Sequence, residues 1–214
     1  MERDAAVDRV ETVLDAVATG PLPVPVREVW VFGDLALGLD PIERLDLYLA
    51  KEVLLGGSPA VDDALAERYG VKGLGTTVDA DWARAHPDRI RTNANGYAAP
   101  AKCLAAQLVP ADEPIHLEVC NAGFRENVTQ RLQAGVDRGA YEELLDPRAV
   151  CVYREGERSD EAIGKLRDGA YAFPPLAEAF EMLGLESEAA EAAAAEVRTW
   201  GDDVEGRSLR ADVV

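Results

Sequence analysis

The sequence predicts an α/β or α+β fold with a central mixed sheet of about four strands, flanking helices and a helical C-terminal segment. Two observations support this prediction. Four short stretches rich in β-branched and aromatic residues are separated by longer stretches with the apolar spacing of a helix. From Asp160 onward the pattern is helical. The 214 residues are enough for one domain with a small helical annex.

The first elements are a helix and two strands. Apolar residues recur every three or four positions from Val7 to Val17, which predicts an amphipathic helix that ends at Gly20. Residues 26–32 are rich in β-formers and stop at a glycine, and residues 45–50 alternate between apolar and polar. Both stretches predict strands.

The middle of the chain mixes clear and weak signals. A Ser-Pro pair opens a predicted helix over residues 58–69. An aspartate predicts a short helix over residues 79–82, and a proline opens another over residues 100–108. Residues 115–120 alternate again and predict the third strand.

The second half is mostly helical. Residues 124–137 and 141–145 predict a long and a short helix, and residues 149–153 predict the fourth strand. After Asp160 a Pro-Pro pair restarts the helical pattern, and residues 187–200 form a strong Ala/Glu helix followed by a glycine.

These elements suggest a core domain over residues 1–155, a helical annex over residues 156–200 packed on it, and a disordered tail over residues 201–214. The annex is either a support for the core or an oligomerisation arm. If the protein is a scaffold, the apolar face of the 187–200 helix is the expected docking surface.

Charge is the strongest compositional signal. The chain has 40 acidic and 22 basic residues, a formal net charge of −18, and only four lysines. An acidic, lysine-poor and alanine-rich chain resembles cytoplasmic proteins of halophilic archaea, because molar salt screens such self-repulsion. The absence of a basic run argues against nucleic acid, and no apolar run is long enough for a membrane span. We therefore expect a cytoplasmic protein that binds a protein partner or itself.

Residues 30–50 carry a second resemblance. Val-Phe-Gly-Asp-Leu-Ala-Leu-Gly, residues 31–38, is a strand followed by a glycine turn, and Arg-Leu-Asp-Leu-Tyr-Leu, residues 44–49, is the next strand. This arrangement resembles minimal nucleotidyltransferases, which have a Gly-Ser turn, two carboxylates at i and i+2 on the next strand, and a third on a later strand. The resemblance implies that Asp46 and Glu118 would hold Mg²⁺ or Mn²⁺ against a nucleotide triphosphate.

The chain departs from this pattern at two positions. Asp34 stands where the family has serine, and Arg44 stands where it has the first carboxylate. We expect Arg44 to pair with Asp46 rather than leave it to a metal ion. The preferred hypothesis is thus a noncatalytic binding or scaffold protein of unknown activity, without cofactor, whose nucleotidyltransferase-like core is degenerate. The alternative is a metal-dependent nucleotidyltransferase that uses Asp46 and Glu118.

Two predicted strands each carry three polar side chains on one face, because residues i, i+2 and i+4 of a strand point the same way. They are Arg44, Asp46 and Tyr48 on one strand and His116, Glu118 and Cys120 on the other. If the strands are neighbours, these side chains form one polar surface, which is either covered by a helix, solvated, or a small-ligand site. Its candidate ligand-binding residues are Gly33, Asp34, Tyr48 and His116, and its pocket would be lined by Tyr48, His116 or Trp30.

Overall fold

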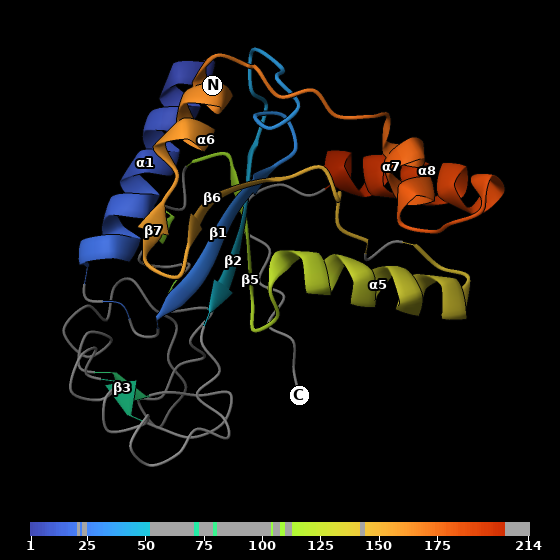
Figure 1. Cartoon of the computed structure of the whole chain (residues 1–214), viewed down its shortest axis with the longest axis horizontal. Helices are drawn as coiled ribbons and strands as arrows, with labels where there is room; N and C mark the ends of the chain where they lie inside the picture. Colours follow the sequence, from blue (N-terminus) through green and yellow to red (C-terminus); the bar gives the residue numbers. More distant parts are fainter. Residues whose placement is uncertain are drawn as a thin grey trace.

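The computed structural model has an α+β fold built on a mixed five-stranded sheet with helices on both faces (Figure 1). It describes residues 1–20, 22, 25–51, 71–72, 79–80, 104, 108–109, 113–141 and 144–203, with side chains in the last helix described as far as Thr199. The strand order is β5-β2-β1-β6-β7. The strands are β1 (Val26–Phe32), β2 (Leu45–Lys51), β5 (Ile115–Cys120), β6 (Val150–Arg154) and β7 (Glu157–Arg158).

All four predicted strands are present, within one residue at each end, and the short β7 extends the sheet. β1 lies between β2 and β6 and is antiparallel to both, while β2 and β5 are parallel. The prediction of a mixed sheet is therefore confirmed. The parallel pair needs a long crossover between its two strands, which residues 52–114 supply.

Five helices lie in the part of the chain that the structure describes. They are α1 (Arg3–Thr19), α5 (Phe124–Arg138), α6 (Asp160–Arg167), α7 (Leu176–Met182) and α8 (Ser187–Asp203). As predicted, α1 is followed by Gly20, and α5 and α6 begin where the apolar spacing indicates. In none of these helices, within the described residues, does an apolar stretch reach the length needed to cross a membrane.

The main core lies between the sheet and the pair α1 and α6 (Figure 1). One face of the strands contributes its aliphatic side chains, and α1 and α6 contribute theirs. The buried residues of this core include Val10, Leu14, Val29, Val31, Leu47, Leu117, Val152 and Ile163. At the surface of the same helix pair, the guanidinium of Arg167 lies 2.8 Å from Asp8 and 2.9 Å from Glu11, which offsets part of the acidic charge of α1.

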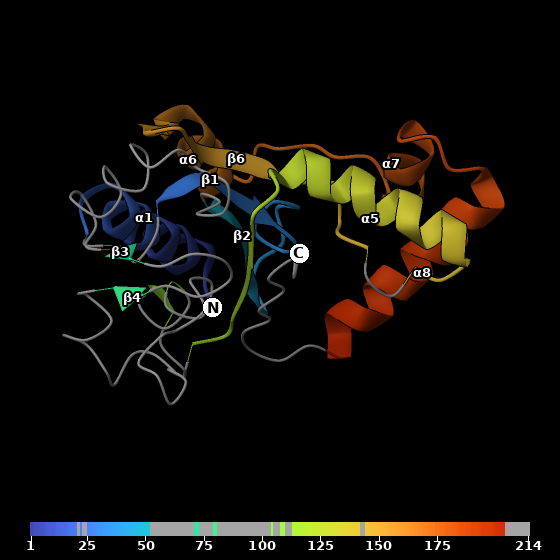
Figure 2. The same ribbon diagram turned by 90° about the horizontal axis from the view of Figure 1, so that it is seen from below.

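The opposite face of the sheet is covered by α5, and α7 and α8 pack beyond it (Figures 1 and 2). Leu132 of α5 shares a cluster with Phe180 of α7 and with Ala190, Ala193 and Ala194 of α8. The three alanines are fully buried. The apolar face of the 187–200 helix is therefore not the open docking surface that the sequence suggested, because its small side chains allow close packing against α7.

Three local predictions need correction. Asp79 does not start a helix, because Asp79–Ala80 forms β4, which pairs with β3 (Val71–Lys72). In the segment 141–145 the described residues, Tyr141, Leu144 and Leu145, are not helical, and the amide of Leu144 bonds to the carbonyl of Tyr141. The last helix continues through Gly201 to Asp203. The predicted helix over 58–69, most of the one over 100–108 and the tail from residue 204 lie outside the described residues.

Candidate functional site

The polar face predicted for two strands forms where β2 and β5 lie side by side. In their parallel register Asp46 is opposite His116, Tyr48 is opposite Glu118, and Ala50 is opposite Cys120. The condition set in the sequence analysis, that the two strands are neighbours with their polar faces aligned, is met. All of these side chains are buried, because α5 covers the face. Of the three kinds of surface considered, the structure thus has the helix-covered one.

At one end of this face, Asp46 is enclosed by the turn that follows β1. Gly33 adopts a left-handed conformation with φ +65°, and a Cβ built there would be 2.2 Å from Oδ2 of Asp46. The backbone can therefore approach the carboxylate only because residue 33 is glycine. Nε of Arg44 lies 2.8 Å from Oδ1 of Asp46, so the expected pairing is confirmed.

Asp34 occupies the turn from the other side. Its Oδ2 accepts hydrogen bonds from the backbone amides of Glu43 at 2.9 Å and Arg44 at 3.4 Å. These amides are donors that an external anion could otherwise use. The carboxylate of Asp34 thus satisfies these two amide donors, next to the Arg44 side chain that pairs with Asp46.

Burial determines the proton affinity of Asp46. Loss of hydration raises the pKa of its carboxyl from 3.8 to about 6, although the Arg44 guanidinium and His116 oppose the rise. Keeping this carboxyl group ionised therefore costs free energy in the folded protein. Its hydrogen-bond donor at 2.8 Å is Arg44, a side chain of the same chain.

Glu118 has the opposite balance. Its Oε2 accepts a hydrogen bond of 2.8 Å from Nη2 of Arg131, and its Oε1 lies 3.4 Å from Nε2 of His116. Burial alone raises the pKa of Glu118, but the hydrogen bonds from His116 and Arg131 and the charge of Arg131 outweigh it, so the pKa is lowered. This carboxylate is therefore ionised and paired within the fold.

Arg131 also ties the face to α5. Its Nε donates to Oδ1 of Asn127 at 2.9 Å, and Nδ2 of Asn127 donates to the Tyr48 hydroxyl at 2.8 Å. That hydroxyl donates to the carbonyl of Ala122 at 2.8 Å, and burial raises its pKa. The polar groups of the face are thus linked into one buried network. Their hydrogen bonds offset the free energy lost when these groups leave water.

An aromatic cluster closes the other end of the face. The rings of Trp30 and Phe124 stack with centroids 4.9 Å apart, and Tyr48 meets Phe124 edge-on at 5.2 Å. Oε2 of Glu28 accepts hydrogen bonds from the Trp30 indole at 2.8 Å and from the Phe124 amide at 3.2 Å, so it satisfies a donor at the first turn of α5.

Glu28, Asn127 and Arg131 belong to this site, although no sequence pattern predicted them. A signal for two of them was present, because Asn127 and Arg131 stand four positions apart in α5 and therefore share a side of the helix with each other. Glu28 offers no such signal, since its partners come from β1 itself and from residue 124.

The two carboxylates of this face, Asp46 and Glu118, are paired with side chains of the protein and do not face an open binding site. Asp46 and Glu118 each have an arginine donor at 2.8 Å, whereas a divalent cation needs several available oxygen ligands. Among the residues that the structure describes, no three His, Cys, Asp or Glu side chains are grouped so that they could hold a metal ion. The donor set at Asp46 and Glu118 does not fit Mg²⁺ or Mn²⁺ in this conformation.

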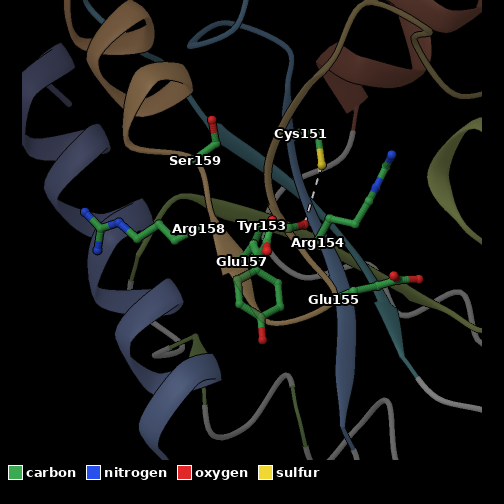
Figure 3. Close-up of a pocket in the computed structure, with 7 residues that line it drawn as sticks. All are labelled: Cys151, Tyr153, Arg154, Glu155, Glu157, Arg158 and Ser159. Atoms are coloured by element: carbon green, nitrogen blue, oxygen red, sulfur yellow. Dashed lines mark hydrogen bonds between the residues drawn. The ribbon is translucent and has the colours of Figure 1, made fainter.

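A cavity of about 480 Å³ lies elsewhere, along β6 and β7. It is lined by Cys151, Tyr153, Arg154, Glu155, Glu157, Arg158 and Ser159, and not by the residues expected for a pocket. Figure 3 shows that Arg154 and Arg158 point away from each other. Arg158 pairs with Glu11, and Ser159 caps α6 by accepting from the amide of Ala162. The two arginines of this lining therefore do not converge on one point of the cavity.

The fold and the covered face together define an α+β protein whose sheet carries a closed network of arginine-paired carboxylates. The chain belongs to the family of unknown function DUF7095, which it matches over residues 2–214. No curated protein and no solved structure is significantly similar to it.

The collision between residue 33 and Asp46 gives a first testable expectation. Gly33→Ala should lower the free energy of unfolding by about 2–4 kcal/mol, which combines a strained left-handed backbone with overpacking against the carboxylate. Gly139→Ala is the matched control, because Gly139 has φ +63° and no atom within 4 Å of a built Cβ, and should lose only about 1 kcal/mol. Equal losses in urea unfolding of the two variants would contradict the close approach at Asp46.

Proposed function

We propose that this protein is a salt-adapted, cytoplasmic, noncatalytic binding or scaffold protein whose nucleotidyltransferase-like core is degenerate. The observation that carries the proposal is the pairing of Asp46 with Arg44 and of Glu118 with Arg131, each at 2.8 Å. These are the two carboxylates that a catalytic role would need. Both are buried and neutralised by side chains of the same chain.

The turn after β1 supports the same proposal. A catalytic turn would offer backbone donors to a phosphate, but here Asp34 accepts hydrogen bonds from the amides of Glu43 and Arg44. A triphosphate entering this turn would meet a carboxylate, which repels it. The cover of α5 adds a physical barrier, since Phe124 packs on Tyr48 and Arg131 bonds to Glu118.

One observation favours the alternative, a metal-dependent nucleotidyltransferase that uses Asp46 and Glu118 with Mg²⁺ or Mn²⁺. The two carboxylates stand on one face of adjacent parallel strands, with Asp46 opposite His116 and Glu118 two positions further along β5. For this role, α5 and both arginines would have to move away. The two proposals therefore differ in whether metal and nucleotide bind at all.

Salt adaptation is proposed from the charge balance of −18 and from the arrangement of ion pairs. Arg167 is shared by Asp4, Asp8 and Glu11, so several acids compete for one base on the surface of α1. Such an excess of acid is tolerated best when molar salt screens it. Folding experiments should accordingly be made in concentrated KCl.

Thermal unfolding in concentrated KCl, with and without Mn²⁺ and a mixture of nucleotide triphosphates, tests the proposal. A ligand that binds the folded state raises the melting temperature by mass action. We expect no shift at millimolar ligand in the wild type or in Asp46→Ala. A metal-dependent rise in the wild type that Asp46→Ala abolishes would overturn the noncatalytic role and favour the nucleotidyltransferase.

A further inference from the structure

The outer end of the α7–α8 hairpin exposes apolar side chains. Met182 is 74% exposed and Leu183 is 44% exposed, and they are adjacent in the chain. Figures 1 and 2 both place the connection between α7 and α8 at the periphery, far from α1. The neighbouring Phe180 and Leu185 are buried in the cluster with α5 and α8. Met182 and Leu183 are thus apolar groups that the fold itself does not cover.

The backbone beneath these side chains is fixed. The amides of Leu183 and Leu185 both bond to the carbonyl of Phe180, and the amide of Gly184 bonds to that of Glu181. Ser187 Oγ donates to the carboxylate of Glu181 at 2.5 Å, which links the two helices across the turn. A partner would therefore meet a surface that is already ordered, and ordering would cost little of the binding free energy.

The charge around this tip has one sign. From Leu176 to Val197 the chain has six glutamates and no lysine or arginine. Five of them are exposed: Glu178, Glu181, Glu186, Glu188 and Glu191. The surface of α1 and α6 is different, because there Arg158, Lys165 and Arg167 pair with the acids. The one base of the two helices, Arg198, stands far along α8 from the tip, so the glutamates of the tip have no basic residue of their own segment near them in the sequence.

We propose that the α7–α8 tip, defined by Met182, Leu183 and the five exposed glutamates, docks a basic protein segment with an apolar anchor. Lysine or arginine side chains of that segment complement the glutamates, and its anchor covers Met182 and Leu183. Methionine suits this role because its flexible thioether adapts to different apolar partners. A second copy of the chain is a poor occupant, because it would bring two like-charged faces together.

The test uses fluorescence anisotropy of a labelled helical Leu/Lys peptide, against a Ser/Lys peptide of equal length and charge, in KCl lowered stepwise to the least that keeps the protein folded, because molar salt screens the glutamates. We expect the Leu/Lys peptide to bind about tenfold more tightly, because only it covers the apolar pair. The double variant Met182→Gln/Leu183→Gln should remove that advantage. The matched control is Leu39→Gln, since Leu39 is 50% exposed in the turn after β1. It should bind both peptides like the wild type.

Three results would overturn this inference. One is equal affinity for the two peptides, which would mean unspecific attraction to an acidic surface. Another is an unchanged preference in the double variant. The last is a dimer, seen by light scattering, that the double variant dissociates, because a second copy would then occupy the tip. The inference rests on the proposed binding role, but its titration uses neither metal nor nucleotide, so its failure and that of the noncatalytic core are separable.

Discussion

Arg131→Met should lower the free energy of unfolding by about 3–5 kcal/mol, the usual cost of removing one partner of a buried ion pair. The reason is that Glu118 is fully buried, and its Oε2 has the Arg131 guanidinium as a donor at 2.8 Å. Methionine fills much of the same volume but leaves the carboxylate without this charge. The variant also loses the bond from Nε to Asn127. Urea unfolding in concentrated KCl measures the loss.

Two further variants make this result specific. Arg125 lies on the same helix, is exposed, and contacts the Trp30 ring at 5.7 Å, so Arg125→Met should lose less than about 1 kcal/mol. Arg131→Lys keeps the positive charge and should recover part of the loss, which remains measurable if the methionine variant does not fold. A loss in Arg131→Met no larger than that in Arg125→Met would contradict the pairing at Glu118.

Asp46→Asn should become more stable relative to the wild type as the pH rises from 4 to 7. The folded-state pKa of Asp46 is raised from 3.8 to about 6, so the folded protein binds this proton more tightly than the unfolded chain does. The stability that the protonated carboxyl contributes is present below pH 3.8 and is lost as the pH rises through about 6. A rise in pKa of about two units corresponds to about 3 kcal/mol of stability that the wild type loses over this pH range. Asp46→Asn does not titrate and therefore keeps its stability.

Glu118→Gln is the control for this pH dependence, since it should change in the opposite direction. The pKa of Glu118 is lowered in the fold, so its ionised form adds stability above the unfolded pKa of 4.5 that disappears as the pH falls through the folded value. The free energy of unfolding of the wild type should thus increase relative to that of Glu118→Gln as the pH rises. Unfolding curves of the three proteins from pH 4 to pH 7 measure both slopes. Parallel curves for Asp46→Asn and the wild type would contradict the burial of Asp46.

The sheet was predictable because its strands carry the signal in their own residues. The β-branched run of residues 26–32 and the alternation at residues 45–50 and 115–120 match β1, β2 and β5. Their order could not be read from the sequence, and the polar faces of β2 and β5 said only what would result if the two strands were neighbours, as they are. Local predictions failed at Asp79, where strand pairing overrides a residue that favours helix starts.

The candidate site was predictable only in part. Arg44 and Asp46 are two residues apart on one strand, so their pairing follows from local geometry. The partner of Glu118 is Arg131, which reaches it only because α5 folds back over the sheet, and no local pattern sets that distance. The sequence also could not show that the alanine face of α8 is buried by α7, because a face of small residues suits close packing and docking equally.

The chain itself holds the carboxylates of this core, and a double-mutant cycle between Glu118 and Arg131 tests this pairing most directly. The four proteins are the wild type, Glu118→Gln, Arg131→Met and the double variant, unfolded by urea in concentrated KCl at neutral pH. We expect a coupling free energy of about 2–3 kcal/mol, because the two groups share a buried hydrogen-bonded pair. A coupling near zero would mean that Arg131 does not hold Glu118, and the core would then be open to another ligand.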